Sequence, residues 1–169
     1  MDLRIAGTVN DSIVDGPGIR FTVFTQGCPH HCPGCHNPQT HDFNGGMITD
    51  TAVIIDKILE NPLLDGVTFS GGEPFCQCEA LCEIAKKVKE AGLDIVTFTG
   101  FTFEQLMEKS DETNMYKKLL SYTDILIDGR FIEAEKSMEA AFRGSLNQRI
   151  IDCQKSLETG TVFERTDLY

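Results

Sequence analysis

The feature that most constrains the fold is a regular alternation of strand-like and helix-like segments between residues 66 and 128. Three short apolar runs typical of buried strands lie in this region: 66–70, 93–99 and 124–128. Between them, residues 81–88 repeat apolar side chains at helical spacing before Gly92, and Thr102 and Gln105 have the spacing of a capping box. Strands joined through helices form right-handed crossovers, so the sequence predicts an α/β fold with a parallel sheet.

Two further elements are predicted before this region. Residues 19–25 are rich in β-branched and aromatic side chains and follow a cluster of turn formers, which predicts a strand. Residues 53–59 predict a helix with Thr49 as its N-cap and Pro62 as its stop. The segment between these elements, which ends near Gly46, carries prolines, glycines and clustered cysteines, so it indicates a long functional loop.

Length and composition suit one globular domain that spans residues 1–169. Hydrophobic residues make up 41% of the chain and charged residues 24%, which excludes a disordered or collagen-like protein. The net charge of -11 would repel a phosphate backbone, so we expect no nucleic-acid partner. No apolar run approaches the roughly 20 residues of a membrane helix, and the first residues lack the pattern of a secretory signal. We therefore expect a cytoplasmic protein without a membrane partner.

Cysteine spacing is the strongest chemical signal in the sequence. Cys28, Cys32 and Cys35 fall within eight residues, and a disulfide framework is a poor explanation for an odd total of seven cysteines. All four histidines lie in or just after this group: His30, His31, His36 and His41. Three thiolates at this spacing suit one face of an iron–sulfur cluster and leave one iron open. The alternative is a structural zinc site with His31 or His36 as its fourth ligand, although zinc ligands usually come in separated pairs.

Glycines and polar residues follow the predicted strands at their carboxyl ends. These segments are Gly27–Cys28, Ser70–Glu73, Thr97–Gly100 and Asp128–Arg130. Because the carboxyl ends of parallel strands share one edge of a sheet, we expect the four segments to converge on one face. A Gly-Gly-Glu-Pro segment alone is typical of an ordinary turn, but its place after a parallel strand and downstream of the cysteines indicates a binding loop.

Three motifs together resemble the radical S-adenosylmethionine superfamily. They are Asp15-Gly-Pro-Gly-Ile-Arg20, the triplet Cys28, Cys32 and Cys35, and Gly71-Gly72-Glu73-Pro74. Residues 15–46, 128–131 and 143–148 are similar to the activating proteins of anaerobic ribonucleoside-triphosphate reductases, and the resemblance covers most of the chain. It implies an incomplete parallel (β/α) barrel of the radical S-adenosylmethionine type.

The resemblance also implies an activity. Such an oxidoreductase reductively cleaves S-adenosylmethionine with one 4Fe-4S cluster and leaves a glycyl radical on the anaerobic reductase. Cys28, Cys32 and Cys35 would be the metal ligands, and no further catalytic residue is implied. The expected partners are the reductase and an electron donor such as reduced flavodoxin or ferredoxin.

The resemblance further implies a set of S-adenosylmethionine contacts. They are Gly34, Cys35, His36, Gly71, Gly72, Glu73, Thr97, Asp128 and Arg130. Arg130 would pair with the methionine carboxylate, Glu73 would shape the glycine loop, and Asp128 would hold the same edge. Gly34 stands where many relatives carry an aromatic residue against adenine, and Thr97 replaces an acidic residue of some related activases near the ribose.

Several alternatives remain open at this point. Cys76, Cys78 and Cys82 have no fourth ligand nearby in sequence, which favours apolar packing over a second cluster, and Cys153 is expected to be structural. The chain could instead activate another glycyl radical enzyme such as pyruvate formate-lyase, or act on a small molecule as a deazaguanine synthase does. From a different class, it could be a non-catalytic iron–sulfur electron carrier or a zinc module.

Overall fold

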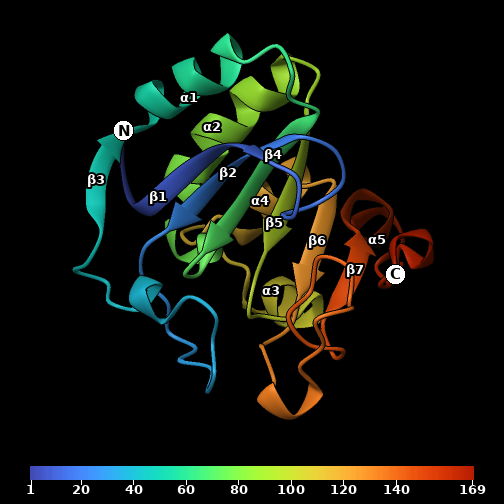
Figure 1. Ribbon diagram of the computed structural model, residues 1–169. Helices are drawn as coiled ribbons and strands as arrows, with labels where there is room; N and C mark the ends of the chain where they lie inside the picture. The colour runs from blue at the N-terminus through green and yellow to red at the C-terminus, as the bar shows by residue number, and fades with distance from the viewer.

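A seven-stranded sheet organises the chain, and the computed structural model describes all residues from 1 to 169. The strands are β1 (Asp2–Ser12), β2 (Arg20–Thr25), β3 (Met47–Asp50), β4 (Gly66–Gly71), β5 (Asp94–Phe98), β6 (Ile125–Asp128) and β7 (Arg149–Asp152). Their order in the sheet is β3-β1-β2-β4-β5-β6-β7, with β3 and β7 as the two edges (Figure 1). The edges do not pair with each other, so the sheet forms an incomplete barrel.

The centre of the sheet is parallel. Strands β2, β4, β5 and β6 pair in parallel, which confirms the α/β prediction. The outer strands β1, β3 and β7 pair antiparallel with their neighbours, and no sequence pattern indicated them. Antiparallel neighbours need no crossover helix, so β1 and β7 extend the sheet without one.

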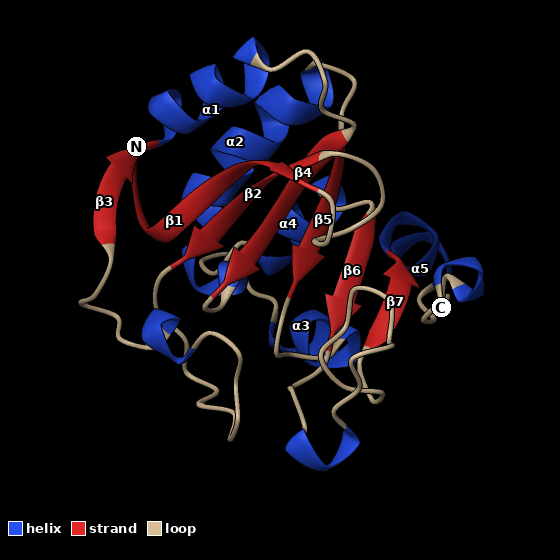
Figure 2. Ribbon diagram, viewed as in Figure 1, coloured by secondary structure: helices blue, strands red, loops and turns tan.

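Five helices accompany the sheet: α1 (Thr51–Glu60), α2 (Cys78–Glu90), α3 (Phe103–Lys109), α4 (Tyr116–Tyr122) and α5 (Cys153–Thr159). Helices α1, α2 and α4 cover one face of the sheet (Figure 2). The predicted capping box between Thr102 and Gln105 is present at α3. The N-cap of α1 is Asp50 rather than the predicted Thr49, because the Asp50 carboxylate accepts a hydrogen bond from the Ala52 amide at 2.9 Å. None of the helices combines the length and apolar character needed to cross a membrane.

The two faces of the sheet bury different side chains. Ile95 and Leu126 belong to a large core on the helix side, whereas Val96 and Ile127 belong to a small cluster with Ile150 on the opposite side. This division follows from the alternation of side chains along a strand. The predicted packing role is confirmed for Cys78, Cys82 and Cys153, which are buried. It is wrong for Cys76, which is exposed because it lies in the turn before α2.

The parallel strands place two long loops at one end of the molecule. The carboxyl ends of β2, β4, β5 and β6 all lie at the same end of the sheet. The segments 26–46 and 129–148 begin at that end (Figure 1). The functional loop predicted after β2 therefore lies at the carboxyl ends of the sheet, where the later strand ends meet it.

Candidate functional site

A cavity of about 590 Å³ lies at the carboxyl ends of the parallel strands. The lining includes Cys28 after β2, Ser70–Gly72 at the end of β4, Phe98–Gly100 at the end of β5 and Gly129 after β6. The expected convergence of the four strand ends is therefore present. The segment between β6 and β7 closes a further side of the cavity through Met138, Arg143 and several neighbours.

Cys28, Cys32 and Cys35 all line this cavity, and all three thiols are free. Cys28 is buried, and burial is the main reason that the pKa of its thiol is raised. No three His, Cys, Asp or Glu side chains lie close enough together to hold a single metal ion. A cuboidal iron–sulfur cluster fits this donor set better, because each thiolate binds a different iron and the thiolates can therefore lie farther apart.

The Gly71–Gly72 loop packs directly on the backbone that leads into the cysteine loop. The Gly72 amide donates to the Thr25 carbonyl and the Glu73 amide donates to the Gly27 carbonyl, each at 2.8 Å. A Cβ atom on Gly72 would lie 2.3 Å from the Gly27 oxygen, and Gly71 has a φ of 95°. Glycine is required at both positions because the loop approaches the chain's own backbone and adopts a left-handed conformation.

The Glu73 carboxylate holds three segments together behind the cavity wall. It is fully buried and accepts a hydrogen bond from the Gly100 amide at 2.8 Å and from the Phe75 amide at 3.1 Å. The Thr99 hydroxyl donates to both carboxylate oxygens at 2.9 Å, and His30 Nε2 lies 2.6 Å from Oε1. Glu73 shapes the glycine loop, as expected, with a carboxylate that lies outside the cavity lining.

Thr97 does not face the cavity. Its side chain is fully buried, and its hydroxyl lies 2.9 Å from the hydroxyl of Thr123. Side chains alternate along β5, so Thr97 lies on the same side as Ile95, whereas Phe98 reaches the cavity. The ribose contact expected of Thr97 is not available in this structure.

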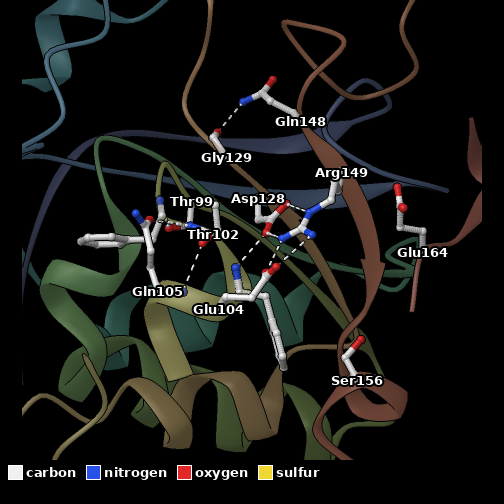
Figure 3. Close-up of polar contacts among 12 residues, drawn as sticks. Thr99, Thr102, Glu104, Gln105, Asp128, Gly129, Gln148, Arg149, Ser156 and Glu164 are labelled. Carbon is white, nitrogen blue, oxygen red and sulfur yellow. Dashed lines mark hydrogen bonds and ion pairs between the residues drawn. The ribbon is translucent and has the colours of Figure 1, made fainter. Parts of the chain in front are cut away.

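Asp128 is likewise occupied by the protein itself. It is buried, accepts a hydrogen bond from the Phe103 amide at 2.8 Å, and pairs with Arg149, whose Nη2 lies 2.6 Å from Oδ2 (Figure 3). The same guanidinium reaches Glu104 at 2.6 Å. Two hydrogen bonds to one guanidinium and one to an amide leave the Asp128 carboxylate as a support of the β6 end rather than part of the cavity lining.

Of the remaining expected contacts, some line the main cavity and others do not. Cys35 and His36 line the main cavity, and the His36 ring lies 5.0 Å from the Phe131 ring. Gly34 is not part of that lining and has a φ of 74°. Arg130 is exposed and lies in a second hollow of about 420 Å³, which shares His30, Cys32 and Phe131 with the main cavity.

Comparisons with known proteins agree with this geometry. A family model described as a 4Fe-4S single cluster domain matches residues 14–151. The anaerobic ribonucleoside-triphosphate reductase-activating protein of Haemophilus influenzae is 32% identical over 148 residues, covering 82% of this chain and 90% of the relative. The protein of the same name from Escherichia coli K12 is 35% identical over 148 residues, covering 80% of this chain and 90% of the relative.

The chain belongs to this family of reductase-activating proteins. The pyruvate formate-lyase-activating enzyme of Clostridium pasteurianum is also similar, with 37% identity over 130 residues. That match covers 73% of this chain but only 50% of the longer enzyme.

Arg143 is the cavity residue that sequence reasoning did not single out as a ligand contact. It is half-buried and lines the main cavity, and no carboxylate pairs with it. Its guanidinium donates to the Ala141 carbonyl at 3.2 Å and the Gln148 carbonyl at 3.3 Å, and it lies 4.3 Å from the Tyr169 ring. The motif at 143–148 was the available signal, but only the fold shows that it reaches the cavity.

Two other family motifs build the walls. Gln148 Nε2 donates to the Gly129 carbonyl at 2.9 Å, which joins the β6 end to the 143–148 segment (Figure 3). Arg20 is fully buried, donates to the Pro17 carbonyl at 2.9 Å and pairs with Asp94 at 2.6 Å. These contacts hold the segment after β1, which presents Asp15 to the cavity.

Proposed function

We propose that this chain cleaves S-adenosylmethionine reductively with a 4Fe-4S cluster held by Cys28, Cys32 and Cys35. Its protein substrate is the anaerobic ribonucleoside-triphosphate reductase, on which it generates a glycyl radical. The observation that carries the proposal is the shared cavity: three free cysteines of one loop line the same cavity as Gly71, Gly72 and Arg143. Membership in the family of reductase-activating proteins supports the same activity.

The cluster supplies the electron chemistry. When bound, the cluster would supply the one electron needed for reductive cleavage of the bond between the sulfur and the 5′ carbon of S-adenosylmethionine, which is the source of the radical chemistry at glycine. Cys28, Cys32 and Cys35 would hold the cluster, and no fourth cysteine lines the cavity to complete the usual set of four.

The chain's own residues orient the cosubstrate. Gly71 and Gly72 present backbone to the cavity beside Cys28, which suits the polar methionine end. Arg143 brings a positive charge to the cavity, which suits a carboxylate, and Cys35 and His36 border the side that suits adenine. Glu73 and Asp128 act one layer farther out, since both carboxylates are buried and hydrogen-bonded within the protein.

The partners follow from the same proposal. The reductase brings the glycine, and a reduced flavodoxin or ferredoxin is the proposed electron donor. A net charge of -11 argues against nucleic acid as a partner. We propose a cytoplasmic location, where both the reductase and its electron donors would be available.

The test uses anaerobically reconstituted protein with S-adenosylmethionine, a reductant and the purified reductase. We expect 5′-deoxyadenosine in solution and a glycyl radical signal on the reductase by electron paramagnetic resonance. Cleavage with a radical on pyruvate formate-lyase and none on the reductase would favour the other activase. A full cluster without any cleavage would favour an electron carrier, and zinc without iron would favour the zinc module.

A further inference from the structure

We infer that His30 is a positioning residue that fastens the cysteine loop to the glycine loop through the buried carboxylate of Glu73. It thereby sets where S-adenosylmethionine lies relative to the cluster. The inference rests on the proposed function for its consequence, but the fastening itself is a contact within the chain, between His30 Nε2 and Glu73 Oε1 at 2.6 Å.

The His30–Glu73 contact lies in a closed environment. The His30 side chain is 4% exposed and the Glu73 side chain 0% exposed. The imidazole packs edge-on against the Phe101 ring at 4.6 Å, and a Cβ atom on Gly100 would lie 2.4 Å from the imidazole. A contact shielded from water and seated on two sides restricts the ring to one orientation.

The other hydrogen-bond partners of the Glu73 side chain do not belong to the cysteine loop. The donors are the amides of Phe75 and Gly100 and the hydroxyl of Thr99, all after β4 or β5. No lysine or arginine pairs with this buried carboxylate. His30 is therefore its one partner from the cysteine loop, and removing the imidazole leaves one oxygen with fewer donors in a buried place.

A second contact explains why His30 controls orientation. The Glu73 amide already binds the Gly27 carbonyl at 2.8 Å, immediately before Cys28. His30 adds a point beyond Cys28 and before Cys32, so the two contacts flank the first thiol. The amides of Gly27 and Cys28 also donate to the Thr40 and His41 carbonyls, at 2.7 and 3.1 Å, so the backbone up to Cys28 is already held. His30 adds the contact that joins the part of the loop between Cys28 and Cys32 to the Glu73 carboxylate.

The next residue offers a matched control. His31 belongs to the same loop and is equally near the cysteines, but it is exposed and its ring packs against His41 at 5.3 Å. It makes no hydrogen bond to Glu73. A substitution at His31 therefore removes an imidazole from the loop without releasing the loop from the carboxylate.

The experiment compares full-length wild type, His30→Ala, His30→Gln and His31→Ala after anaerobic reconstitution. Iron content is measured first, and S-adenosylmethionine is then titrated while the electron paramagnetic resonance spectrum of the reduced cluster is followed. We expect His30→Ala to need roughly tenfold more S-adenosylmethionine for the spectral change, because this variant loses the hydrogen bond between His30 and the Glu73 carboxylate. His30→Gln, which keeps a donor, should recover part of the loss, and His31→Ala should match wild type.

A second measurement tests the fastening without S-adenosylmethionine. Amide hydrogen exchange in the cluster-free protein should be faster over residues 27–36 and 71–76 in His30→Ala and unchanged in His31→Ala. Equal exchange and equal titrations in wild type and His30→Ala would overturn the inference. If wild type shows no response to S-adenosylmethionine, the proposed function fails, and hydrogen exchange still decides the role of His30. If His30→Ala loses its cluster, the His30→Gln variant decides. Binding of S-adenosylmethionine by His30→Gln as tight as in wild type supports the inference. Binding weakened tenfold without faster hydrogen exchange contradicts it.

Discussion

Single residues at the cavity have one of two roles: some face the cavity and others hold its walls. Cys28, Cys32, Cys35 and Arg143 face it, whereas Glu73 is buried behind the wall with four hydrogen-bonding neighbours. The distinction matters for mutation, because a facing residue can be removed without loss of fold and a buried charged residue cannot.

The first prediction concerns the cluster ligands. Alanine at Cys28, Cys32 or Cys35 should abolish the brown colour and the cleavage of S-adenosylmethionine. The reason is that the cavity has no further cysteine to replace a lost cluster ligand. Alanine at Cys76 or Cys153 should retain both, since neither lines the cavity. Iron and acid-labile sulfide analysis measures the outcome, and a full cluster in Cys32→Ala would remove that residue from the ligand set.

The second prediction concerns the carboxylate of S-adenosylmethionine. Arg143→Ala should weaken binding about tenfold to 150-fold, because a charge-assisted hydrogen bond contributes about 1.5 to 3 kcal/mol. Arg143→Lys should recover part of the loss by restoring the charge without the planar guanidinium. The matched control is Arg130→Ala, which removes a guanidinium from the neighbouring hollow.

Calorimetric titration of the reconstituted variants distinguishes the two arginines. We expect Arg130→Ala to bind S-adenosylmethionine as wild type does. Weakened binding in Arg130→Ala together with normal binding in Arg143→Ala would instead support the contact implied by the family resemblance. The two positions are 13 residues apart in a single segment, so both variants alter the same part of the chain.

At the scale of elements, β6 and β7 form a support for one wall of the cavity. Arg149 at the start of β7 joins Asp128 at the end of β6 to Glu104 in the first turn of α3 (Figure 3). Asp128 in turn accepts from the Phe103 amide at the N-terminus of α3. The Arg149 guanidinium therefore connects β6, β7 and α3 next to Gly129.

We predict that Arg149→Ala lowers the free energy of unfolding of the cluster-free protein by about 2 to 4 kcal/mol. The reason is that the substitution leaves the Asp128 carboxylate buried without its cation. Arg165→Ala is the control, because Arg165 pairs with the exposed Asp167 and such a pair contributes at most about 1 kcal/mol. Urea denaturation measures both, and equal losses in the two variants would contradict the prediction.

The same network predicts a dependence on pH. The pKa of the Glu104 carboxyl lies below its ordinary value, chiefly because Arg149 donates a hydrogen bond to it. A lowered pKa in the folded state stabilises the protein above the ordinary glutamate range, and this stabilisation is lost as the pH falls through the lowered value. The stability difference between wild type and Arg149→Ala should therefore narrow on acidification. A difference that stays constant below that range would exclude the contribution of Glu104.

At the scale of the whole molecule, the cavity is an opening at one end of an unclosed sheet. Loops 26–46 and 129–148 border it, and three exposed apolar residues lie at its mouth: Ile13, Val14 and Met138. An opening of this kind gives a large protein substrate access to the cavity, and it gives small molecules access as well.

We therefore predict that the reconstituted cluster is sensitive to air. Dioxygen can enter the open cavity and attack the iron that lacks a protein thiolate, since no fourth cysteine is present in the lining. Cluster absorbance should fall on aeration and fall more slowly when S-adenosylmethionine occupies the cavity. Absorbance that survives prolonged aeration unchanged would count against an open iron.

The local features of this protein follow from residues that are close together in the chain. The spacing of Cys28, Cys32 and Cys35, the capping box at Thr102 and the alternation that forms the parallel strands are all set by residues a few positions apart. The outer strands β1, β3 and β7 were not predicted. Their pairing depends on the neighbouring strands rather than on a strong strand pattern in their own sequences.

Which groups face the cavity depends on contacts between distant parts of the chain. Thr97 and Phe98 are neighbours in the chain, yet strand alternation turns the first toward the helices and the second toward the cavity. Glu73 is committed to His30, Thr99 and Gly100, and Asp128 to Arg149, through contacts that join distant parts of the chain. The direction of a side chain at a strand end depends on such long-range partners, because a buried carboxylate needs donors that its own segment does not supply.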